Sequence, residues 1–180
     1  LRKTLDEVSA ASVRWKVGRA LVAASRIYEV RKDYVKAIEC CRKGFEYLQI
    51  VTEYRPLQDR VQVAVAQLQL GSLLVLNGKT EEGFATLDKA NDYFSQVGDA
   101  LKARDSSLAG LPLVPVASLY WKNGKKSEAY DILLRTVDLL KKAHEAKFVK
   151  DENLYVAYSN LSTMAKGLKL TDDSVKFKKL

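Results

Sequence analysis

The chain has 180 residues, of which 47% are hydrophobic and 29% charged, and it contains only 3 prolines and 9 glycines. A chain of this length can bury about 70% of its unfolded surface, so the composition indicates a folded, helix-rich protein and excludes the disordered and collagen-like classes. The net charge is +8, from 30 Lys and Arg against 22 Asp and Glu, which suits an acidic protein partner or nucleic acid.

Few residues are available for metal binding, disulfide formation or catalysis. Cys40 and Cys41 are adjacent, which rules out a disulfide framework, and His144 is the single histidine. We therefore expect no metal, no cofactor, no enzyme activity and a reducing intracellular compartment. The least charged long segment, residues 108–121, is too short to span a membrane and contains two prolines. Because the chain begins with Leu1, we expect it to be processed or part of a longer protein.

Helical periodicity runs along the chain in pairs of segments that are joined by short polar turns. In the second segment of each pair, apolar residues recur at i, i+3, i+4 and i+7, which predicts an amphipathic helix. The three apolar stripes are Ala37, Ile38, Cys41, Phe45 and Leu48, then Phe84, Leu87, Ala90 and Phe94, then Ala129, Ile132, Leu133, Val137 and Leu140. At the turns, Gly78 and Gly124 suit a left-handed helix end, and Asp33, Thr80 and Ser127 are candidate N-caps.

The pairs repeat. Asn77-Gly78-Lys79 recurs 46 residues later as Asn123-Gly124-Lys125 with similar flanks, and a copy 46 residues earlier carries Arg31-Lys32-Asp33 at the turn. The predicted units are about 18–51, 60–97 and 110–143, with a partial unit at 153–180 that ends in "TDDSVKFKKL". We expect one domain built from these units.

The stretch "LGSLLVLNGKT", residues 70–80, also has some features of a phosphate-binding loop. That loop needs four residues between its glycines, a strand before it and a helix after it. Here six residues separate Gly71 from Gly78, and the preceding segment is helix-compatible. We interpret Gly71 as a small residue that lets two helices approach closely.

The spacing of large and small residues resembles the tetratricopeptide repeat (TPR) family. The matching positions are Leu21, Ala24-Ser25, Tyr28, Ala37, Cys41 and Gly44 in the first copy, Leu70-Gly71, Leu74, Gly83, Leu87 and Ala90 in the second, and Leu113, Val116-Ala117, Tyr120, Ala129, Leu133 and Thr136 in the third. The resemblance implies an all-α fold of antiparallel helix pairs in a right-handed superhelix. The period exceeds the family's usual length of about 34 residues. Longer units of this sort look like those of kinesin light chain, or those of the repeat subunits of the cohesin loader and the anaphase-promoting complex, and the sequence does not choose among these. A helical bundle without repeats is the alternative.

The resemblance also implies a function. TPR proteins of this kind are non-enzymatic scaffolds or adaptors that bind a protein partner in a groove lined by the first helix of each unit, often within a larger complex. The groove candidates are Arg19, Val22, Arg26, Leu68, Ser72, Val75, Val114, Ser118, Trp121 and Lys122. The clamp by which chaperone-binding members hold a terminal carboxylate is absent, since its positions are occupied by Val22, Arg26, Gln69, Leu111 and Pro115. The alternative is that Val75, Leu76 and Trp121 are covered by the chain's own helices.

Two further surfaces follow from the ends of the chain. The fourth unit is incomplete, so we expect more chain or another subunit to pack near Tyr155, Tyr158 and Leu161. The lysines of the C-terminal third carry the alternative function, which is RNA or DNA binding. These lysines are Lys141, Lys142, Lys147 and Lys150.

Overall fold

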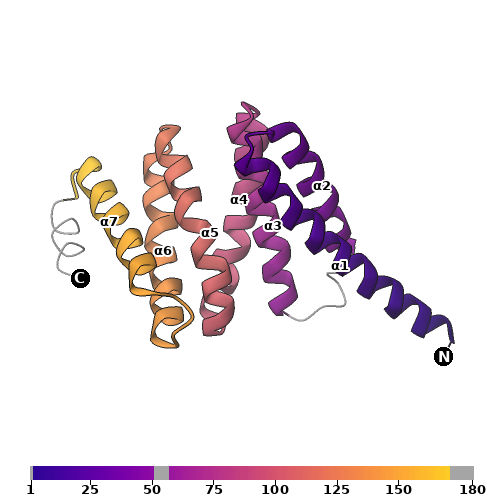
Figure 1. Ribbon diagram of the computed structural model, residues 1–180. Coiled ribbons are helices and arrows are strands. Elements are labelled where there is room, and N and C mark those ends of the chain that lie inside the picture. Colours follow the sequence, from indigo (N-terminus) through magenta and orange to yellow (C-terminus); the bar gives the residue numbers. More distant parts are fainter. Residues whose placement is uncertain (1, 51–56, 171–180) are drawn as a thin grey trace. The chain divides into compact units, whose positions relative to one another are not determined.

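The computed structural model describes residues 2–50 and 57–170, with side chains described from residue 10 to 50 and from residue 59 to 170. These ranges contain only helices and turns, which confirms the all-α prediction (Figure 1). The helices are α1 (Arg2–Val30), α2 (Tyr34–Ile50), α3 (Leu57–Leu76), α4 (Thr80–Val97), η2 (Gly98–Ala100), α5 (Ala103–Lys122), α6 (Lys126–Glu145) and α7 (Asp151–Gly167). The expected final helix at "TDDSVKFKKL" lies outside the described residues.

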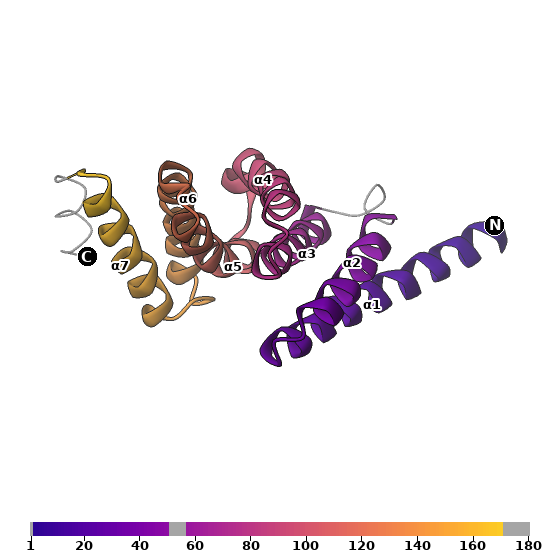
Figure 2. The ribbon, with the colours of Figure 1, turned by 90° about the horizontal axis from the view of Figure 1, so that it is seen from above.

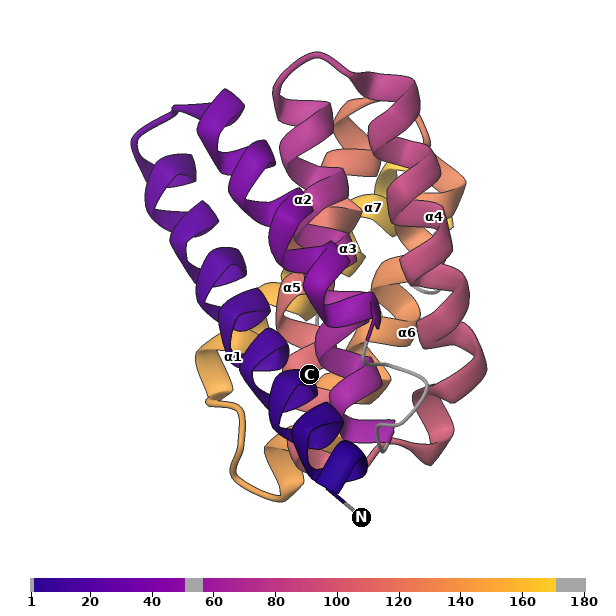
Figure 3. The same ribbon diagram turned by 90° about the vertical axis from the view of Figure 1, so that its right-hand side faces the viewer.

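The chain divides into two compact units between Ala90 and Asn91, inside α4. In the first unit α1 packs against α2, and α2 packs against α3 (Figure 3). In the second unit α5 packs against α6, and α6 packs against α7 (Figure 2). Each unit is thus built from neighbouring antiparallel helices. Among the described helices, none has a run of apolar residues long enough to cross a lipid bilayer.

The first helix of each pair ends in the same hydrogen-bonded turn. The second residue after the helix has a positive φ, which is 60° at Lys32, 81° at Gly78 and 83° at Gly124. The next backbone N–H then donates to a carbonyl five residues back, which is the pattern of a Schellman motif. These bonds run from Asp33 to Tyr28 (3.0 Å), from Lys79 to Leu74 (2.9 Å) and from Lys125 to Tyr120 (3.1 Å). The left-handed helix ends predicted at both glycines are confirmed.

The helix starts agree only in part with the expected N-caps. Asp33 caps α2, because its Oδ1 accepts a hydrogen bond from the backbone N–H of Lys36 at 3.2 Å. The prediction for Ser127 is wrong, since it lies inside α6 and the N-cap position is held by Lys125 without a side-chain bond. Thr80 is the first residue of α4.

Small residues occupy the points where the two helices of a pair cross. In the first unit, a Cβ added at Gly71 would lie 2.7 Å from Leu87 Cγ and 3.0 Å from the carbonyl oxygen of Gly83. A Cβ at Gly83 would lie 2.5 Å from Val75 Cγ2. These distances are below van der Waals contact, so the helices can approach this closely only with glycine. The structure confirms that Gly71 serves helix contact, and no strand precedes it as a phosphate loop requires.

Glycines also allow α1 and α2 to approach closely, because a Cβ added at Gly18 would lie 2.9 Å from the carbonyl oxygen of Gly44. Other small residues of the helix pairs are fully buried, namely Ser25, Ala37, Ala117 and Ala129. The apolar stripes predicted for the second helices are also buried, apart from the half-buried Phe45. Packing of α2, α4 and α6 through these stripes therefore forms the core of the units.

Candidate functional site

In the first unit, α1 and α3 share a partly exposed polar surface. Arg19 and Arg26 are exposed on α1. The two helices are joined across this surface because Gln69 Nε2 donates to Glu29 Oε2 at 2.6 Å. Val22 and Ser72, two further groove candidates, are half-buried. The arrangement leaves two guanidinium groups free to contact an acidic or polar segment.

Two groove candidates on α3 are core residues instead. Leu68 is 1% exposed and Val75 8% exposed, and Val75 lies where a Cβ on Gly83 would stand. The residues that follow them on α3, Gln69 and Leu76, are turned by about 100° around the helix axis, and they are half-buried and exposed respectively. Leu68 and Val75 are therefore not accessible to a partner, whereas Leu76 is 45% exposed.

In the second unit, α5 carries an exposed apolar stripe. Leu108 and Leu111 are each 40% exposed, and Pro115 lies on the same face. The helix runs through Pro112 and Pro115, whose missing N–H groups leave the carbonyls of Leu108 and Leu111 without their helical donors. Exposure of this face lets water or a bound partner satisfy these carbonyls.

The remaining candidates on α5 lie at the edge of the stripe or beyond it. Val114 and Ser118 are half-buried, and Lys122 is exposed. Trp121 is half-buried because its ring packs on α7, where a Cβ added at Gly167 would lie 2.6 Å from Cζ2. Lys126 Nζ lies 5.4 Å from the centroid of the same ring. Trp121 is thus partly covered by the chain's own helix and presents only part of its indole to a partner.

Of the three residues predicted to pack against more chain or another subunit, only Tyr155 is exposed. Tyr155 is 71% exposed, and Val156 beside it is 48% exposed. Tyr158 and Leu161 are 7% and 0% exposed, and the Tyr158 ring lies 5.7 Å from Lys141 Nζ of α6. Leu161 lies three positions after Tyr158 on a helix, so the two side chains share the face that packs inward. Their predicted role as an outward-facing surface is therefore not seen.

The four candidate lysines are in different local settings. Lys141 lies against the Tyr158 ring, and Lys142 Nζ donates to the carbonyl of Asp99 at 3.2 Å. Lys147 adopts a φ of 62° at the end of α6, and Lys150 is the N-cap residue of α7. Lys141 and Lys142 are thus engaged within the protein, which leaves Lys147 and Lys150 for contact with phosphates.

The two side chains with catalytic potential, Cys41 and His144, both make contacts within the fold. Cys41 is fully buried, its Sγ lies 3.6 Å from the carbonyl oxygen of Ala66, and burial raises the pKa of its thiol to about 12. A thiol with so high a pKa is a poor nucleophile. His144 Nε2 lies 2.5 Å from Asp151 Oδ1, which links the end of α6 to the start of α7. Within the described ranges no three metal-ligating side chains come together.

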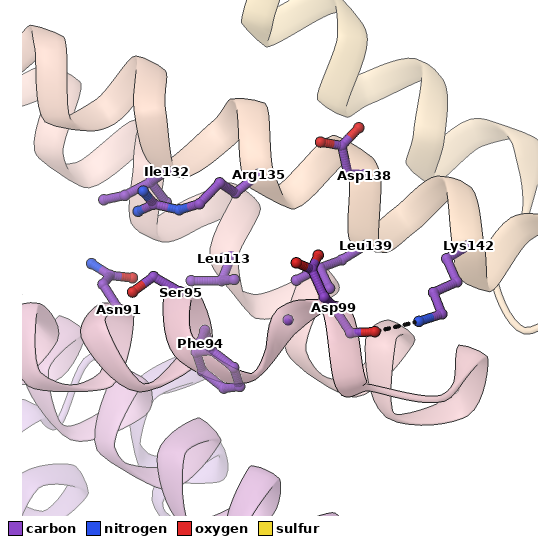
Figure 4. Close-up of a pocket in the computed structure, with 11 residues that line it drawn as sticks. Asn91, Phe94, Ser95, Asp99, Leu113, Ile132, Arg135, Asp138, Leu139 and Lys142 are labelled. Carbon is purple, nitrogen blue, oxygen red and sulfur yellow. Dashed lines mark hydrogen bonds between the residues drawn. The ribbon is translucent and has the colours of Figure 1, made fainter.

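A pocket that sequence reasoning missed lies in the second unit, between the end of α4, α5 and α6 (Figure 4). Its volume is about 210 Å³. The lining combines the apolar side chains of Phe94, Leu113, Ile132 and Leu139 with Asn91, Ser95, Gly98, Asp99, Arg135, Asp138 and Lys142. These residues come from three helices and show no motif, so no pattern within one segment could have identified them.

The fold is similar to that of a known repeat protein. The structure matches a crystal structure from Podosopora anserina, of a protein assigned as a kinesin light chain with nearly identical TPR-like repeats, at a TM-score of 0.64. The match covers 91% of this chain and 72% of the other, with 17% sequence identity. No family model and no curated protein matches the sequence. The likeness shows that the fold is the TPR-like helix-pair repeat.

Proposed function

We propose that this protein is a non-enzymatic scaffold that binds a segment of a protein partner on the exposed faces of its first helices, as part of a larger complex. The observation that carries this proposal is the stripe on α5, where Leu108 and Leu111 stay 40% exposed although the same helix buries its other face. Exposed apolar side chains in a contiguous stripe are typical of interaction surfaces. In the first unit, Arg19 and Arg26 would contribute charge to the same function.

We also propose that the sequence repeat, which consists of one helix pair and its connection, is 46 residues long. The supporting observation is that α2, α4 and α6 begin at residues 34, 80 and 126, while α1, α3 and α5 end at residues 30, 76 and 122. With this constant interval, residues of α1, α3 and α5 that are 46 positions apart occupy the same position within their respective helix pairs. Arg19, Val65 and Leu111 are one such set, and each is at least partly exposed.

The proposal can be tested by a matched pair of charge substitutions. Leu111→Asp places a carboxylate on the proposed binding stripe of α5, whereas Leu134→Asp places one on α6 at nearly the same exposure, 38%. Each immobilised variant is incubated with extract of the source cells, and retained proteins are quantified by mass spectrometry. We expect Leu111→Asp to lose at least about 90% of a specific partner that Leu134→Asp retains, because a buried unpaired charge costs about 2 kcal/mol or more.

Two results would count against the proposal. One is that wild type and both variants retain the same proteins in the same amounts while their circular dichroism spectra agree. The other is that Leu134→Asp alone abolishes retention, which would move the binding surface to the second helices. Leu68→Glu is not a suitable variant, because Leu68 belongs to the core and the charge would unfold the first unit.

A further inference from the structure

The pocket between α4, α5 and α6 contains a buried amide that the fold leaves half-satisfied. Asn91 is 7% exposed, and its Nδ2 donates to the Tyr120 hydroxyl at 3.2 Å. Its Oδ1 is buried and has no hydrogen-bond partner among the described residues. Because an unpaired buried acceptor lowers stability, this oxygen is a group that a hydrogen-bond donor in the pocket, from water or from a bound partner, would stabilise.

The size of the pocket limits what it can hold. A volume of about 210 Å³ exceeds the roughly 30 Å³ that one water molecule occupies in the liquid. It is below the roughly 300 to 1,000 Å³ of pockets that enclose small-molecule ligands. Phe94, Leu113 and Leu139, all less than 9% exposed, provide its apolar floor. The space therefore suits one or two amino-acid side chains rather than a nucleotide or a cofactor.

The charges of the pocket are distributed unequally between its two ends. At one end Asp99 and Lys142 lie together, and Lys142 Nζ donates to the backbone carbonyl of Asp99 (Figure 4). At the other end the Arg135 guanidinium extends toward Asn91 and Ser95, whereas the Asp138 carboxylate points away from them (Figure 4). Arg135 makes no ion pair with another described residue. The Asn91 end thus offers an unbalanced positive charge.

We propose that this pocket binds a peptide segment of a protein partner in which an apolar residue is followed by an acidic one. The apolar side chain packs on Phe94, Leu113 and Leu139, and the carboxylate approaches Arg135. A backbone N–H of the segment would donate to Asn91 Oδ1 once binding moves the side chains that bury this oxygen. A peptide group carries both an N–H donor and a C=O acceptor. It can therefore form a hydrogen bond with the Asn91 side chain whichever way the oxygen and nitrogen of that amide are oriented.

This site is separate from the exposed stripes of the proposed function. The stripe of α5 is formed by residues such as Leu108 and Leu111, and neither lines the pocket. Leu113, on the buried face of α5, contributes to the pocket floor instead. An experiment that refutes binding at one of these two surfaces therefore does not refute binding at the other. The Leu111→Asp variant should bind a peptide in the pocket as tightly as the wild type does.

The test is a titration of the isotope-labelled protein, observed by NMR, with the capped dipeptide N-acetyl-Phe-Glu-amide. We expect saturable shifts of the Asn91 side-chain amide and of the Gly98 backbone amide, with a Kd on the order of 1 mM. N-acetyl-Phe-Lys-amide and N-acetyl-Gly-Glu-amide should each bind at least about threefold more weakly, because one lacks the carboxylate and the other the apolar side chain.

Substitutions separate this site from non-specific association. Arg135→Gln should weaken binding of the Phe-Glu peptide at least about threefold, whereas Arg104→Gln, an equal charge change at an exposed position of α5 outside the pocket, should leave it unchanged. Asn91→Leu should remove the saturable shift of Gly98. The proposal is overturned if no peptide gives saturable shifts in the wild type, or if Arg135→Gln and Arg104→Gln bind the Phe-Glu peptide equally well.

Discussion

The close crossing of α3 and α4 gives a sharp prediction for Gly83→Ala. The added Cβ would lie 2.5 Å from Val75 Cγ2, 2.8 Å from the backbone nitrogen of Val75 and 2.9 Å from the carbonyl oxygen of Gly71. A side-chain methyl can rotate away, but the two backbone atoms can move only if the helices separate. Separation of the helices would loosen the packing of Leu87 beside them.

Two opposing contributions set the size of the effect. Alanine is favoured over glycine in a helix interior by about 1 kcal/mol. Overpacking of a well-packed interface costs about 1 to 3 kcal/mol, and contact with two backbone atoms places Gly83→Ala in the upper half of that range. The free energy of unfolding should therefore fall by about 1 to 2 kcal/mol. For a chain of this size, the midpoint of thermal unfolding should drop by about 2 to 8 °C.

Thermal and urea unfolding followed by circular dichroism measure this change. Gly98→Ala is the control, because its nearest neighbour, Leu139 Cδ2, would lie at an ordinary distance of 3.8 Å, and its stability should stay within about 0.5 kcal/mol of wild type. If Gly83→Ala instead raises the unfolding midpoint, as helix propensity alone requires, then close helix approach is not the reason for glycine at this position.

Four further predictions concern other local features. Gly167→Ala should shift the fluorescence emission of Trp121, because the new Cβ would lie 2.6 Å from the ring, and the shift should vanish in a Trp121→Phe background. Lys32→Gly should raise the free energy of unfolding by about 0.5 to 1 kcal/mol in urea titrations, since φ at Lys32 is 60°; unchanged or lower stability would contradict this. Iodoacetamide at pH 8 should label Cys40 at least about tenfold faster than Cys41, whose thiol is fully buried with a pKa raised to about 12. Because that folded-state pKa lies above the ordinary value of 9.0, stability should be unaffected below about pH 9 and should fall as the pH rises toward 12.

Local features of the chain were the ones that sequence reasoning predicted well. The left-handed ends at Gly78 and Gly124, the Asp33 cap and the apolar stripe from Ala129 to Leu140 each depend on residues within one or two helical turns. The wrong N-cap at Ser127 also has a local explanation, because a polar residue one or two positions into a helix looks the same in sequence as one at its start.

The candidate groove was predicted less well, since it depends on the direction in which each helix is turned. Leu68 and Val75 are buried, while Gln69 beside Leu68 is half-buried and Leu76 beside Val75 is 45% exposed. An error of one position changes the direction of a side chain by about 100°. On α3 most positions are apolar, so the sequence does not distinguish its two faces.

The sequence by itself therefore determined the helices, their turns and their pairing, because backbone hydrogen bonds and helix-end sterics act between residues that are close along the chain. Only the tertiary structure decided that Gly167 covers part of Trp121, and that Asn91 and Arg135 meet at one pocket. The last two residues are on different helices. Their proximity is set by how α4, α5 and α6 pack, which depends on the shapes of many side chains at once and not on any spacing within one segment.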